Sequence, residues 1–197
     1  MKKNLEVNTI LNMIKTGSNI IFPLITIPYV LRILSADNIG KVDFGNSFVS
    51  YFSLIASLGI STYAIRECAK VRDDKVKLSK TVQELLIINS ITMFLTCIVF
   101  IVTVALVPEF AAEKELYIIN GIGMVLNMFA ITWLYNALEQ YAYITVCNMV
   151  VKLLSLVLMF LLVHNPEDYI VYGGITVFAS SASYVFNFVY ATKFVSF

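Results

Sequence analysis

Residues 85–107 read LLIINSITMFLTCIVFIVTVALV, an apolar run that carries no charge and stops at Pro108. An α-helix needs about 20 such residues to cross the ~30 Å hydrocarbon core of a bilayer. The run therefore predicts a transmembrane helix, which we expect to extend over residues 82–107.

Similar apolar segments precede and follow this run, and short polar connectors separate them. Hydrophobic residues make up 59% and charged residues 14% of the 197-residue chain, whereas soluble domains are about half apolar and one-quarter charged. We expect an all-α integral membrane fold with about six transmembrane helices, in which residues 1–197 form a single transmembrane lobe. The expected helices span residues 9–34, 43–63, 82–107, 116–136, 144–163 and 169–192.

Positive charges gather on one side of the membrane if these helices alternate in direction. The connector RECAKVRDDKVKLSK at residues 66–80 holds six cations, and Lys2, Lys3 and Lys193 fall on the same side. Because lysine and arginine are enriched in cytoplasmic loops, we expect both termini to be cytoplasmic. Two interpretations of the connector stay open: a determinant of topology, or a site for anionic lipid headgroups.

The sequence contains no assembled enzyme or metal motif. His164 is the only histidine, and no P-loop, nucleophile elbow or Gly-x-Gly-x-x-Gly run occurs. We therefore expect a protein that is not an enzyme and that binds neither a cofactor nor a metal. The net charge of +1 also argues against a nucleic-acid partner, which would require a basic surface.

Polar side chains form a stripe along almost every expected helix. Asn12, Lys15 and Asn19 recur on one face of the first helix, and Asn46 and Lys152 belong to similar stripes in the second and fifth. Polar atoms avoid lipid, so these faces must meet other helices or water. Interhelical hydrogen bonds are one interpretation, and lysines that extend to the membrane surface are another. Our hypothesis is a central, water-filled cavity with a positive bias.

Pro23 and Pro28 lie inside the first expected helix. A proline within a helix removes a backbone hydrogen bond and bends the helix. In lipid, the freed carbonyl groups need neighbouring helices or water as partners. We therefore expect a kinked first helix that is covered by protein on its bent side.

Three segments resemble the N-terminal lobe of the Wzx-type polysaccharide flippases of the MOP superfamily: FPLITIPYVLRIL at residues 22–34, residues 38–74, and WLYNALEQYAYITVCNMVVKLLSLVLMFLLV at residues 133–163. The resemblance implies alternating-access export of undecaprenyl-pyrophosphate-linked repeat units, of O-antigen or capsule, across the bacterial cytoplasmic membrane. Arg32, Arg66, Glu67 and Glu139 match family positions, and the last three would belong to a cytoplasmic loop or gate. The candidate cavity residues are then Asn12, Lys15, Asn19, Arg32, Asn46 and Lys152.

Members of that family have two six-helix lobes, and the helices expected here fill only the first. We therefore expect a second six-helix lobe as a partner, either a missing C-terminal half or a second copy, besides membrane lipids and the lipid-linked oligosaccharide. A lobe of a MATE-type drug or metabolite exporter is an alternative, which an acidic residue inside the first helix would favour; Glu6 precedes that span. A truncated, inactive half-transporter is a further alternative.

Overall fold

The computed structural model describes the backbone of residues 2–196 and the side chains of residues 10, 13, 14 and 16–196. Every regular element in this range is a helix. The unbroken long helices are α1 (Lys2–Ile33), α4 (Lys75–Leu106), α8 (Tyr141–Leu162) and α9 (Tyr169–Ala191). The paired ones are α2 (Ala36–Ser57) with α3 (Ile60–Lys70) and α6 (Lys114–Asn127) with α7 (Thr132–Ala137). The short connectors are α5 (Pro108–Ala112) and the 3₁₀ helix η1 (Pro166–Asp168).

Five segments of the described chain are long and apolar enough to cross a membrane. The α6–α7 pair forms one of them, and the bent α2–α3 pair makes a sixth if it is counted as one span. Large apolar side chains such as Leu24, Phe94 and Leu161 are exposed on the outer faces of these helices, where lipid would cover them. The expected all-α membrane fold with about six spans is confirmed.

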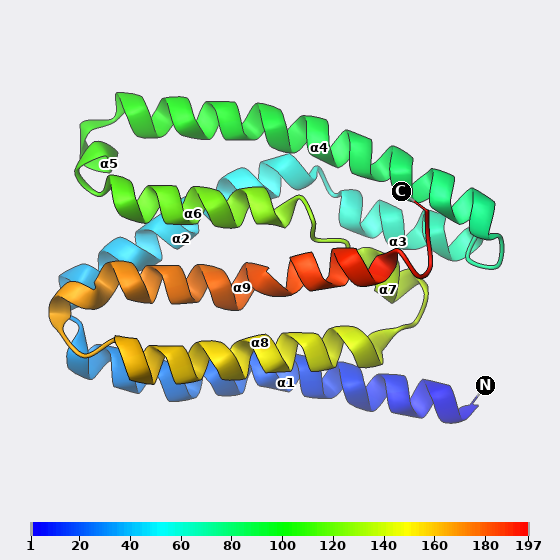
Figure 1. Cartoon of the computed structure of the whole chain (residues 1–197), viewed down its shortest axis with the longest axis horizontal. Coiled ribbons are helices and arrows are strands. Elements are labelled where there is room, and N and C mark those ends of the chain that lie inside the picture. The colour runs from blue at the N-terminus through cyan, green and yellow to red at the C-terminus, as the bar shows by residue number, and fades with distance from the viewer. Residues whose placement is uncertain (1, 197) are drawn as a thin grey trace.

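The long helices lie side by side, and the start of α1 and the end of the chain lie at the same end of the bundle (Figure 1). We call this the terminal end and the opposite one the distal end. Helix α9 packs against both α6 and α8, α8 packs against α1, and α2 contacts α4 and α6. An even number of membrane crossings returns a chain to the side on which it starts, and this agrees with both ends of the chain lying at the terminal end.

Two expected helices are interrupted. The expected helix over residues 43–63 breaks at Leu58 and Gly59, whose φ values of 43° and 72° are left-handed, and α3 continues after a bend of 42°. A left-handed residue ends an α-helix because its carbonyl and N–H groups leave the hydrogen-bond ladder. The expected helix over residues 116–136 ends at Asn127 and resumes at Thr132. Between them, the N–H groups of residues 128–130 bond to carbonyls three residues back, which tightens the turn and stops the helix.

Side chains accept hydrogen bonds from backbone N–H groups in the first turns of two helices. The Asp74 carboxylate accepts hydrogen bonds from the N–H groups of Val76 and Lys77, both at 3.1 Å, and so caps α4. These bonds and the Lys77 ammonium hold the pKa of Asp74 below its ordinary value. Ser35 caps α2 in the same way by accepting from the Asn38 N–H.

Three clusters of buried apolar side chains hold the described bundle together. The first, around Trp133 and Tyr135, joins α3 and α7 to α4, α8 and the end of α9 at the terminal end. The second, around Phe100 and Met124, lies between α2, α4 and α6. The third joins the distal ends of α1 and α8 to α9. The polar stripes of α1, α2, α8 and α9 meet in the space between these clusters, which is where the candidate site lies.

Candidate functional site

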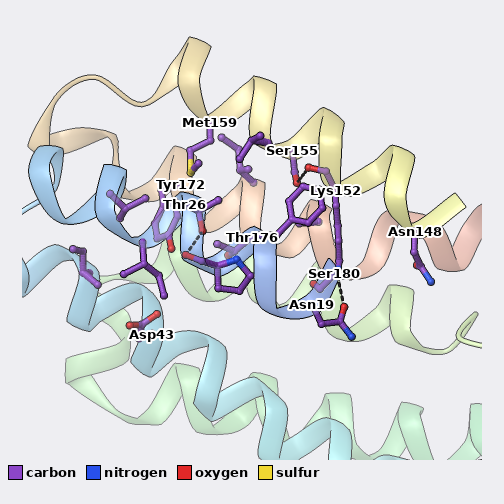
Figure 2. Close-up of a pocket in the computed structure, with 18 of the residues that line it drawn as sticks. Asn19, Thr26, Asp43, Asn148, Lys152, Ser155, Met159, Tyr172, Thr176 and Ser180 are labelled. Carbon is purple, nitrogen blue, oxygen red and sulfur yellow. Dashed lines mark hydrogen bonds between the residues drawn. The ribbon is translucent and has the colours of Figure 1, made fainter. Parts of the chain in front are cut away.

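A cavity of about 790 Å³ lies among α1, α2, α8 and α9, with Thr132 of α7 at its edge. We call it the first chamber (Figure 2). Helices α1 and α8 supply polar side chains from the stripes that the sequence contains, and α9 adds a third set. The main polar residues of its lining are Asn19, Thr26, Asp43, Asn148, Lys152, Ser155, Tyr172, Thr176 and Ser180.

Lys152 spans the first chamber from α8 to α1. Its ammonium donates a hydrogen bond to the Asn19 side-chain oxygen and lies 5.7 Å from the centre of the Phe22 ring (Figure 2). Its side chain is half-buried, about midway along α8. A lysine at this depth is costly unless it faces a partner or a cavity, and Lys152 has both.

Asp43, which the sequence analysis missed, brings a carboxylate into the same chamber from α2. A signal for it is present in the sequence, because Asp43, Asn46, Ser50 and Ser53 follow one another at spacings of three and four residues. Among the described residues that line the first chamber, Lys152 is therefore balanced by one carboxylate. The positive bias that we expected is not visible in this part of the lining.

A second chamber of about 340 Å³ adjoins the first, among α2, α6 and α9. Thr176, Ser180 and Tyr184 line both chambers, so the two share a wall, and we call the two chambers together the cleft. The Asn46 amide donates to the Thr176 hydroxyl at 3.4 Å and ties α2 to α9 at the boundary. The described lining of the second chamber contains asparagines and hydroxyl-bearing residues, and no lysine, arginine, histidine or carboxylate.

Comparison with known proteins identifies the family of this chain. A family model described as "Polysaccharide biosynthesis protein" matches residues 5–197. The chain belongs to this family. The expected resemblance to the Wzx-type flippases is thereby confirmed at the level of the family, and the chain is a multi-pass membrane protein.

Two relatives carry the name "Putative O-antigen transporter". The one from Escherichia coli is 27% identical over 176 residues, which are 88% of this chain and 42% of the relative. The one from Shigella dysenteriae is 28% identical over 168 residues, which are 85% of this chain and 41% of the relative. The chain thus spans about two-fifths of the length of these curated relatives. No solved structure shows significant similarity to it.

The structure brings three of the six candidate cavity residues to the cleft. Asn19 and Lys152 line the first chamber, and Asn46 lines the second. Arg32 is exposed near the distal end of α1 and lines neither chamber. The side chains of Asn12 and Lys15 lie outside the described residues, so their place in the cavity stays a prediction.

The prolines of α1 do not interrupt it, because the helix is continuous from Lys2 to Ile33. Pro23 lines the first chamber, and its carbonyl accepts a hydrogen bond from the Thr26 hydroxyl at 3.4 Å. Pro28 is exposed on the same helix. Pro23 is also exposed, so the kink at the two prolines and its cover by protein both stay predictions.

The three candidate loop or gate residues lie at the terminal end but do not pair with one another. Glu67 accepts a hydrogen bond from the Lys70 ammonium at 2.7 Å. Glu139, which has a left-handed φ of 58°, accepts from the Arg72 guanidinium at 3.0 Å. This second bond joins the α3–α4 connector to the α7–α8 connector. Arg72 is a partner that the sequence analysis missed, since 67 residues separate it from Glu139; Arg66 is exposed.

An ion pair joins helices at the distal end of the lobe. The Lys41 ammonium of α2 lies 2.8 Å from the Glu113 carboxylate at the start of α6, and the Tyr169 hydroxyl of α9 donates to the same carboxylate at 2.7 Å. The bonds from Lys41 and Tyr169 hold the pKa of Glu113 below its ordinary value of 4.5. Three helices are thereby joined beyond the first chamber. Within the described residues, no three His, Cys, Asp or Glu side chains are grouped as a metal site would require.

Proposed function

We propose that this chain is the first lobe of a flippase that exports undecaprenyl-pyrophosphate-linked oligosaccharide repeat units from the cytoplasmic to the outer leaflet. The observation that carries the proposal is the cleft of two adjoining chambers, which places polar side chains of α1, α2, α6, α8 and α9 inside a largely apolar bundle. Sugar hydroxyl groups can cross a membrane only where protein or water replaces their hydrogen bonds. The names of the two relatives, both O-antigen transporters, support a saccharide cargo.

The mechanism that we propose is alternating access between two lobes. This lobe supplies one wall of the substrate path, and a second six-helix lobe, from the rest of a longer chain or from a second copy, supplies the other. The sugars cross in the cleft while the lipid tail stays in the bilayer at the seam. Lys152 attracts the pyrophosphate as a point charge that requires no fixed geometry.

A MATE-type exporter of cationic drugs or metabolites is the second candidate. Asp43 favours it, because a carboxylate inside the first chamber attracts a cation. The two candidate functions have different cargo and therefore predict different results in a direct transport assay.

The experiment that tests the proposal reconstitutes the complete transporter that carries this chain into liposomes. A fluorescent undecaprenyl-pyrophosphate oligosaccharide is placed in both leaflets, and an impermeant glycosidase measures how much of it becomes accessible. The proposal expects accessibility to rise faster than in protein-free liposomes, and this chain alone to give a rise only if a second copy of it supplies the second lobe. If the complete transporter moves a cationic dye and leaves the lipid-linked sugar in place, the MATE-type exporter replaces the flippase as the proposed function.

We also propose that the terminal end faces the cytoplasm. The cations of residues 66–80 and Lys193 lie at that end, whereas Asp37, Glu109, Glu113 and Asp168 lie at the distal end. In a variant that lacks the native cysteines, we expect Lys75→Cys to be protected from an impermeant thiol reagent in intact cells and Glu109→Cys to react. Labelling at position 75 would reverse the orientation and the proposed direction of export.

A further inference from the structure

Four of the five serine and threonine hydroxyl groups in the described lining of the second chamber donate a hydrogen bond to a carbonyl of their own helix. Ser50 donates to the Ser47 carbonyl at 2.7 Å, Thr176 to the Gly173 carbonyl at 2.7 Å, and Ser180 to the Val177 carbonyl at 2.9 Å. A hydroxyl group has one donor and two acceptor lone pairs. Each of these side chains therefore offers lone pairs to the chamber, and could donate to a ligand only by giving up a bond to its own helix.

The asparagines contribute both hydrogen-bond donors and hydrogen-bond acceptors. Asn120 is 2% exposed and donates one N–H to the Leu116 carbonyl at 3.1 Å, so its amide oxygen is an acceptor for the chamber. Asn46 donates to Thr176, and its oxygen likewise remains an acceptor. Each amide keeps a second N–H as a donor. Asn127, Ser53 and Tyr184 add further neutral donors and acceptors, so the described lining holds neutral groups of both kinds and no cation.

We infer that the second chamber is a specificity site for an uncharged sugar residue and disfavours an acidic one. Sugar hydroxyl groups donate to the serine and threonine oxygens and accept from the amides, so both sides are satisfied. A uronic-acid carboxylate carries a full charge, and here it would lose its hydration and meet neutral groups without a cation to balance that charge. The volume of about 340 Å³ is near the lower limit for small-molecule pockets, roughly 300–1,000 Å³, and suits one or two sugar rings.

The two chambers then divide the substrate between them. The first chamber holds Lys152, which suits a phosphate, and the second lies beside it among α2, α6 and α9. Tyr184 lines both chambers, and the apolar side of a sugar can pack against an aromatic ring. This inference rests on the proposed function, because it names the sugar chemistry that the same cleft accepts.

Protection of a cysteine in the second chamber tests the inference without a transport assay. The purified whole chain, with Cys68, Cys97 and Cys147 replaced by alanine, carries Ser53→Cys, which lines the second chamber. Its reaction with uncharged methyl methanethiosulfonate is followed by mass spectrometry. We expect triacetylchitotriose, a neutral trisaccharide, to slow the reaction and trigalacturonate, an acidic one, to leave the rate unchanged. A second reporter, Ser50→Cys, replaces the first if that variant does not fold.

Matched variants identify the groups that matter. Asn46→Ala and Ser180→Ala should each weaken protection by triacetylchitotriose about five-fold, the effect of losing one neutral hydrogen bond. Ser57→Ala is the control, because Ser57 lies on the same helix as Asn46, donates to the Leu54 carbonyl at 2.9 Å and does not line the chamber. Protection by trigalacturonate at an equal or lower concentration, or by neither sugar, overturns the inference. Selective protection without sugar transport by the complete protein overturns the proposed function instead.

Discussion

Replacing Lys152 by glutamine in the complete transporter is expected to reduce transport of the lipid-linked oligosaccharide by about ten-fold to a hundred-fold. Lys152 is the one cation among the described residues that line the first chamber. A charged hydrogen bond to phosphate is worth more than a neutral one, and glutamine keeps only the neutral kind. Lys152→Arg preserves the charge and should retain most of the activity at equal membrane abundance.

A comparison with Asn19 distinguishes this role from a structural one. Lys152 also ties α8 to α1 through its bond to the Asn19 oxygen, so loss of activity could result from a loosened helix pair. Asn19→Ala removes that tie and leaves the charge in place. If Lys152 acts on the substrate, Asn19→Ala should be much milder than Lys152→Gln. Equal losses in the two variants, with Lys152→Arg no better than Lys152→Gln, would show that Lys152 is a helix anchor. Lys193→Gln, at an exposed cation of the terminal end, controls for net charge.

The stripes of polar residues could be predicted from the sequence because their spacing depends only on helical periodicity. Asn19, Asn46 and Lys152 line the two chambers, and the rest of the Asn19 stripe lies outside the described side chains. Periodicity does not say which stripes meet. That Asn46 contacts Thr176 while Lys152 contacts Asn19 depends on the packing order of the helices, which only the tertiary structure provides.

The helix breaks and the long-range ion pairs could not be predicted for related reasons. Leu58 adopts a left-handed φ that leucine rarely adopts. Because leucine is apolar and ordinarily helical, the sequence gives no sign of a break there, and hydropathy indicates a continuous helix. Glu113 is charged and near a span end, where its sequence neighbours suggest a solvated position, and its partner Lys41 is 72 residues away. Asp43 was missed although its spacing matches the stripe, because it begins the expected helix, where a carboxylate at the interface needs no partner.

The packing that shapes the second chamber depends on Gly173, where α9 approaches α2 and α6. A Cβ atom at Gly173 would lie 2.6 Å from Cδ1 of Leu116, and the Leu116 side chain is only 1% exposed. The end of the Leu116 side chain would have to move, and a buried side chain has little free space to move into. Gly174, the next residue, has no atom within 4 Å of its own Cβ position and is therefore a matched control.

Gly173→Ala is expected to destabilise the purified chain by about 1–3 kcal/mol through overpacking, seen as a lower melting temperature in detergent. Gly174→Ala should be neutral or slightly stabilising, since alanine favours a helix by up to about 1 kcal/mol over glycine. Thr176 and Ser180 follow Gly173 on α9, so the displaced helix should also open the second chamber and speed modification of Ser53→Cys. Leu116→Ala and Gly173→Ala together should destabilise the chain by less than the sum of the two single changes, because the two side chains compete for one space. Equal melting temperatures for Gly173→Ala and Gly174→Ala would mean that α9 does not depend on this close approach, and the chamber walls would then be held chiefly by the Asn46–Thr176 bond and the distal ion pair.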